Sequence, residues 1–116
     1  MKSNLDVCTL FVDSNKEKAE SSNMYFVEDK IYTYGTILAQ KFKDENGEDS
    51  IIVNETKYST SSSKHLKYLK SALGKCKNEK LNIYIIKDRV PKGTESLDIH
   101  IINIDKLINI NKIIKI

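Results

Sequence analysis

Residues 56–74 constrain the fold more than any other part of the chain, because they predict a helix that is apolar on one side only. Leu66, Leu69 and Leu73 recur at i, i+3 and i+7, which places them in one stripe at helical spacing. Such a stripe is buried against another layer in a stable domain. We therefore predict a principal helix over residues 62–76 that packs on the rest of the chain.

The start of this helix allows two interpretations. Ser61, Ser62 or Ser63 can act as its N-cap, because a serine oxygen accepts a hydrogen bond from an unpaired first-turn amide, and Gly74 is a natural stop. The favoured interpretation is an ordinary solvated surface helix, since lysines on a polar face serve solubility. The alternative is an anion site at the positive end of the helix. Its side chains would be Ser61, Ser62, Ser63, Lys64, His65, Lys67 and Lys70.

The residues before the helix have the alternation of a sheet. Residues 24–28, 31–42 and 50–54 predict a three-stranded meander, with a turn near Asp29 and a hairpin at Asn46-Gly47. Gly35 predicts a bulge or bend inside the middle strand.

The two ends of the chain also carry signals of secondary structure. Residues 5–12 predict a strand, and Ser14 with Glu17 has capping-box spacing, which predicts a short helix through Ala19. Beyond the principal helix, residues 81–87 and 99–104 predict strands, and residues 89–96 predict an irregular loop. The tail from residue 105 predicts a helix capped by Asp105.

Together these elements predict a single α+β domain over residues 1–116, with an antiparallel sheet of about five strands and one principal helix on one face. A composition of 40% hydrophobic and 30% charged residues is typical of a globular protein. No apolar run approaches the roughly 20 residues that cross a bilayer, and no secretory signal is evident, so we expect a cytoplasmic location in a host bacterium and no membrane partner.

Catalytic patterns are missing from the sequence. His65 and His100 are the only histidines, and nothing places a nucleophile or a base beside either of them. His65 either packs at the edge of the apolar stripe or reaches a bound anion, whereas His100 is expected to be exposed. Cys8 and Cys76 lack zinc or redox spacing, which favours reduced thiols. We expect a protein without enzymatic activity, without a cofactor and without a metal site.

Part of the chain resembles a module of small uncharacterised proteins from bacteriophages and mobile elements. The pattern runs Tyr-x-Thr, then Ala, then Asn-x-Thr-x-Tyr-Ser-x-Thr-Thr-Ser-x-His, and the resemblance covers residues 24–73. It implies a phage or mobile-element origin and carries no chemistry with it. The matching residues are Tyr34, Thr36, Ala39, Asn54, Thr56, Tyr58, Ser59, Ser63 and His65, with Ser61 and Ser62 where threonines are common.

Charge is uneven along the chain and suggests two functions. Residues 1–55 carry a net charge of −5 and residues 56–116 one of +8, from the charged side chains of each part. The first hypothesis is a non-enzymatic accessory protein that blocks a host protein, such as a defence nuclease complex, in the manner of anti-CRISPR proteins. Its contact would be the acidic turn of Asp44, Glu45, Glu48 and Asp49. The alternative is a nucleic-acid-binding module that uses the basic helix.

Overall fold

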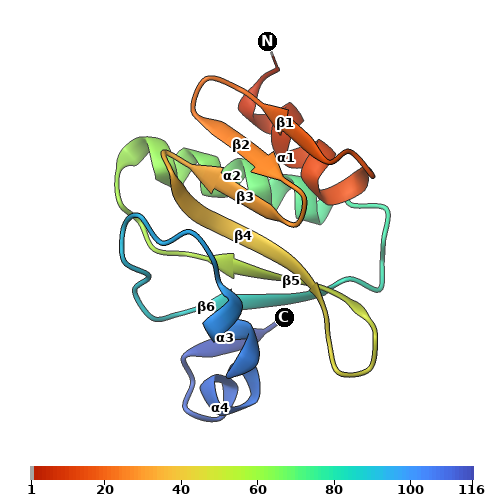
Figure 1. Ribbon diagram of the computed structural model, residues 1–116, viewed down its shortest axis with the longest axis vertical. Coiled ribbons are helices and arrows are strands. Elements are labelled where there is room, and N and C mark those ends of the chain that lie inside the picture. The colour runs from red at the N-terminus through yellow and green to blue at the C-terminus, as the bar shows by residue number, and fades with distance from the viewer. Residues whose placement is uncertain (1) are drawn as a thin grey trace.

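The computed structural model describes residues 2–116 and shows a seven-stranded sheet with helices against both of its faces (Figure 1). The predicted α+β class is confirmed. The helices are α1 (Asn4–Asp13), α2 (Thr60–Gly74), α3 (Asp98–Ile102) and α4 (Ile104–Asn109). The strands are β1 (Lys18–Glu20), β2 (Met24–Val27), β3 (Lys30–Thr33), β4 (Thr36–Lys43), β5 (Asp49–Asn54), β6 (Asn82–Ile86) and β7 (Ile113–Lys115).

The strands lie in the sheet in the same order as in the chain. All neighbouring pairs are antiparallel except β5 and β6, which run parallel. The parallel pair differs from the antiparallel sheet that we predicted. Its cause is α2, because a helix between two strands carries the chain back to the starting edge of the sheet, so that the next strand runs in the same direction.

Two separate apolar clusters fill the two faces of the sheet. In the first, α1 and α2 pack on the sheet, and the predicted stripe of Leu66, Leu69 and Leu73 is buried there. In the second, α3, α4 and the loop before them cover β4 to β7. In Figure 1, α1 and α2 lie in the upper half of the molecule, whereas α3 and α4 lie at its lower end. No helix within residues 2–116 is long and apolar enough to cross a membrane.

The N-terminal prediction was wrong. Residues 5–12 form α1, because Ser3 and Asp6 make a reciprocal capping box and Val7, Cys8 and Phe11 then share one buried face. Ser14 does not begin a second helix. It is the C-cap of α1, and its hydroxyl donates a hydrogen bond of 2.7 Å to the carbonyl of Leu10.

The long middle strand that we predicted is two strands. The chain reverses at Tyr34 and Gly35, which have φ angles of 49° and 77°, so Gly35 belongs to a turn and not to a bulge. The bulge lies nearby instead, because Ile31 pairs with Ala39 and Tyr32 pairs with Ile37. These pairings leave one extra residue, Leu38, in β4.

At the C-terminal end, residues 99–104 form parts of α3 and α4 and not the predicted strand. The side chains that pack against the second cluster include Ile101, Ile104, Leu107 and Ile108, which are spaced as on a helix. The predicted tail helix is right only in part, because α4 ends at Asn109 and residues 113–115 form β7. Asp105 is not its cap: it lies in the first turn of α4, whose N-cap residue is Asn103. The predicted strand over residues 81–87 and the irregular loop over residues 89–96 are confirmed.

Candidate functional site

Helix α2 begins two residues before the predicted start. Its N-cap is Ser59 and none of Ser61, Ser62 or Ser63, because the Ser59 hydroxyl accepts a hydrogen bond of 3.1 Å from the amide of Ser62. The Ser62 hydroxyl in turn accepts one of 2.9 Å from the amide of Ser59. Ser62 is buried in this capping box. Ser59 and Ser62 therefore cap the helix, whereas Ser61 is exposed and takes no part in the capping box.

His65 is buried and lies in a polar network between three elements. The side-chain amide of Asn4 in α1 donates to Nε2 at 3.2 Å, and Nδ1 lies 2.5 Å from the hydroxyl of Thr33 in β3. Because the amide nitrogen of Asn4 can only donate, this arrangement favours the neutral tautomer with its proton on Nδ1. Burial lowers the pKa of His65 and favours this neutral form. Both ring nitrogens are thus engaged, which fits the packing interpretation.

The lysines of α2 are exposed, as predicted, and they are not equivalent. Lys70 forms an ion pair of 2.5 Å with Glu55, which also pairs with Lys87 at 3.1 Å. Burial opposes ionisation of Glu55, yet the hydrogen bonds from the two lysines outweigh it and lower the pKa of that carboxyl. Within residues 2–116, Lys64 and Lys67 have no ion-pair partner.

The acidic turn between β4 and β5 carries three of the predicted carboxylates, and the fourth, Asp49, is the first residue of β5. The turn extends beyond the sheet in Figure 1. Asp44 shapes the loop, because its Oδ1 accepts hydrogen bonds of 2.9 Å from the amides of Asn46 and Glu48. Asp49 pairs with Lys43 at 2.5 Å. Glu45 is exposed and forms no ion pair within residues 2–116.

A groove of about 220 Å³ lies between this turn and the helices α3 and α4. It places Asp44 and Glu45 beside Ile101, Ile102 and Asp105, and Lys43 and Lys115 also line it. Ile102 is 79% exposed, although it is among the most apolar side chains in the protein. Sequence reasoning missed this neighbourhood. The only signal was a run of C-terminal isoleucines that fitted neither a helical nor a strand period.

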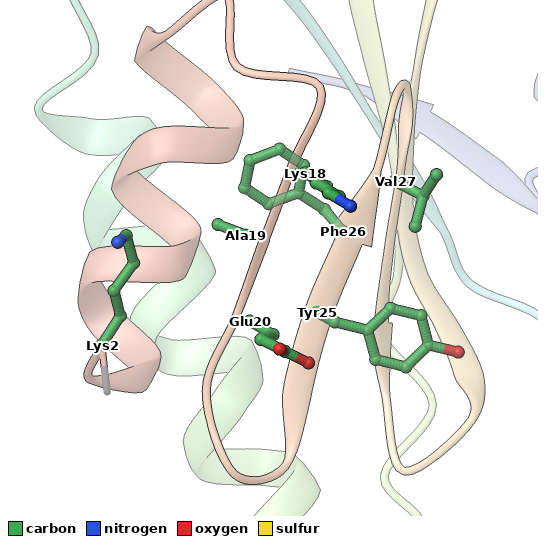
Figure 2. A pocket seen from close by; sticks show the side chains of 7 residues that line it. All are labelled: Lys2, Lys18, Ala19, Glu20, Tyr25, Phe26 and Val27. Atoms are coloured by element: carbon green, nitrogen blue, oxygen red, sulfur yellow. The ribbon is translucent and has the colours of Figure 1, made fainter.

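A second groove, of about 460 Å³, lies along the edge strand β1 (Figure 2). Figure 2 shows Ala19 and Phe26 on the side toward α1, with Tyr25 and Val27 on the other side of the ribbon. The strand has only three residues, and its outer positions are Lys18 and Glu20, both exposed. Short length and charge discourage the addition of another strand, so this edge is protected.

Reactive groups are sparse in the described part of the chain. Residues 2–116 contain no cluster of three side chains that could hold a metal ion. Both cysteines are free, and burial raises the pKa of the Cys8 thiol to about 12, which suppresses its nucleophilic form. His100, which we predicted to be exposed, is half-buried, and its Nδ1 has no hydrogen-bond partner among these residues.

Three of the residues that carry the phage-module resemblance, Asn54, Thr56 and Tyr58, form a structural network. The Asn54 side chain donates to the carbonyl of Ile37 at 2.9 Å and accepts from the amide of Thr56 at 2.9 Å. The hydroxyl of Thr56 accepts from the amide of Val90 at 2.8 Å, and the Tyr58 hydroxyl donates to the Val90 carbonyl. These bonds tie β4, β5 and the loop after β6 together. Neither family models, nor curated proteins, nor solved structures give a match to this chain.

Proposed function

We propose that this protein is a non-enzymatic accessory protein of a phage or mobile element that binds and blocks a host protein. The expected target is a defence nuclease complex, because such complexes bind nucleic acid in basic grooves. The contact is the hairpin–helix surface, which we define as Asp44, Glu45, Ile101, Ile102 and Asp105.

The observation that carries this proposal is the shared groove of the acidic turn and Ile102. A single exposed isoleucine is ordinary on a protein surface. Here Ile102 is 79% exposed beside two carboxylates of the turn. An apolar centre with a polar rim is the usual anatomy of a protein interface.

The two parts of this surface predict different contributions to binding. Burying the Ile102 side chain against a partner contributes roughly 1.5–3 kcal/mol, which slows dissociation. The four carboxylates of residues 44–49 attract a basic partner over a distance, which speeds association and depends on salt. The preferred partner is therefore a protein with a basic groove next to an apolar cleft.

The test begins with a pull-down from bacterial lysate and proceeds with the purified partner. We expect the variant carrying Asp44→Asn, Glu45→Gln, Glu48→Gln and Asp49→Asn to associate at least about tenfold more slowly at low salt, with a smaller difference at high salt. Asparagine at position 44 keeps an oxygen for the turn amides, so the loop is retained. We expect Ile102→Ser to speed dissociation and to leave the association rate unchanged.

The matched control is the double variant Lys64→Gln and Lys67→Gln, which alters the exposed face of α2. If this variant loses binding while the carboxylate variant binds at the parental rate, the hairpin–helix surface is not the contact.

The basic helix remains the basis of a second candidate function, favoured by the two unpaired lysines. With Lys70 held by Glu55, a nucleic-acid contact through Lys64 and Lys67 predicts a slope of about −2 for log K against log salt. Absence of DNA and RNA binding at about 50 mM salt would remove this alternative.

A further inference from the structure

A pocket of about 380 Å³ lies at the opposite end of β4 from the acidic turn. Its lining consists of seven residues with hydroxyl groups and one lysine, Lys92, and it includes no carboxylate. The residues come from the β3–β4 turn, the start of α2 and the loop after β6, which are distant in the sequence. Small-molecule sites are usually lined by apolar side chains with a few placed polar groups, so this pocket is unusually polar and suits a polar or charged ligand.

Most of these hydroxyls already have partners and give the pocket a fixed shape. Thr33 bonds to His65, and the Thr36 hydroxyl accepts a bond of 2.9 Å from the amide of Gly93. Tyr58 donates to the Val90 carbonyl. Ser59 and Ser62 bond to each other in the capping box, so the amide of Ser62 already has a hydrogen-bond partner.

Three side chains of the pocket have no hydrogen-bond or ion-pair partner within residues 2–116. They are Tyr34, Ser61 and Lys92, one from each of the three segments. Ser61 and Lys92 offer a hydroxyl group and an ammonium group, which are donors that suit a ligand with only acceptor oxygens, such as a phosphate. Tyr34 offers an aromatic ring.

Tyr34 occupies a position that ordinarily selects a different residue. Its φ of 49° lies in the left-handed region, where asparagine and glycine are favoured in a two-residue hairpin turn. The residue is 50% exposed, and its ring stacks on that of His65 with centroids 5.4 Å apart. Since the hydrogen bonds of His65 fix that ring, Tyr34 presents a supported aromatic face at the pocket rim. A planar base can stack on such a face.

We propose that this pocket binds a nucleoside monophosphate, with the phosphate on Lys92 and Ser61 and the base stacked on Tyr34. The phosphate needs donors and a cation, which the pocket supplies, and it would be repelled by carboxylates, which the lining lacks. The site is independent of the hairpin–helix surface, because the strand β4 separates them.

Calorimetric titration of the full chain with adenosine monophosphate, adenosine and inorganic phosphate tests this site. We expect the monophosphate to bind with a Kd of about 1 mM or tighter, and more tightly than either fragment. Lys92→Gln should weaken its binding at least about tenfold. Tyr34→Asn should weaken the monophosphate similarly and leave phosphate binding unchanged, because it removes only the stacking face.

Tyr34→Asn is suited to this test because asparagine accepts the left-handed turn, so the protein remains folded. Circular dichroism checks this. Lys64→Gln is the matched control. It also removes one positive charge, but Lys64 lies in α2 and does not line the pocket. Equal losses in Lys64→Gln and Lys92→Gln would show general charge attraction and overturn the site. No binding of the monophosphate at about 1 mM, or binding of polynucleotides only, would also overturn it.

Discussion

The helices on the two faces of the sheet differ in how deeply they bury their side chains. On the first face, α1 and α2 bury residues such as Phe11 and Leu69 completely. On the second face, neither α3 nor α4 contains a buried residue, and Ile99 and Ile102 are 74% and 79% exposed. The first face thus uses its apolar side chains for folding. The second face leaves some of its apolar side chains exposed to solvent.

The largest expected difference between the faces is in the cost of truncating a leucine. Leu69→Ala in α2 should lower the free energy of unfolding by about 2–5 kcal/mol, because it leaves a cavity in a closed core. Leu107→Ala in α4 should cost clearly less, since that side chain is only half-buried and its loss opens onto solvent. Urea denaturation of both variants measures this. Equal losses would mean that the second face is as tightly packed as the first.

The two histidines sharpen the comparison. His65 on the first face bonds through both ring nitrogens, whereas Nδ1 of His100 on the second face is buried without a partner. His65→Phe should cost about 1–3 kcal/mol, because it leaves Asn4 and Thr33 without their bonds. His100→Phe should be close to neutral, since no bond is lost at Nδ1. Denaturation midpoints test both, and a greater loss at position 100 would reverse the assignment.

Acidic pH should lower the free energy of unfolding through both histidines, His65 on the first face and His100 on the second. Burial lowers the pKa of His65, and burial lowers that of His100 against the opposing effect of Asp88. In the unfolded chain each ring takes up a proton near its ordinary pKa of 6.5. The unfolded state then binds more protons, so the free energy of unfolding should fall as the pH drops below about 6.5 and through the lower folded pKa.

Urea midpoints at about pH 7.5 and about pH 5.5 measure this dependence. His65→Gln should remove part of the acid-dependent loss, while a dependence that is unchanged when both histidines are replaced would assign it to other groups. Glu55 acts at lower pH. Its lowered pKa contributes stability above its ordinary value of 4.5, which is lost as the pH falls below that value.

The same contrast explains what the sequence could predict. The stripe of α2 has strict spacing and strong stop signals, so its face was predictable. Residues 5–12 are apolar at almost every position, and only the Ser3–Asp6 capping box distinguishes a helix there. The turn at Tyr34 lacks a turn-forming residue type at its first position. Among the C-terminal isoleucines, the covered and exposed ones differ only through contact with the sheet, which local spacing does not encode.

For the candidate surfaces, the acidic turn was evident from Asn46-Gly47 and its flanking carboxylates. Its proximity to Ile102 depends on where α3 packs, which is tertiary information. The convergence of Tyr34, Ser61 and Lys92 likewise requires three separated segments to meet. Sequence reasoning therefore found the charged half of one surface and only the serine run of the pocket.

A small effect on stability is also expected at Ile102, where the effect on a complex tests whether the second face is an interface. Ile102→Ser should change the free energy of unfolding by no more than about 0.5 kcal/mol, because most of the side chain already contacts water. If the exposed isoleucine serves a partner, the same change should weaken that complex by roughly 1.5–3 kcal/mol. Ile110→Ser is a useful reference, since Ile110 is 51% exposed and does not line the groove beside the acidic turn. A large loss of stability at Ile102, or equal effects of both variants on the complex, would contradict the division of the two faces.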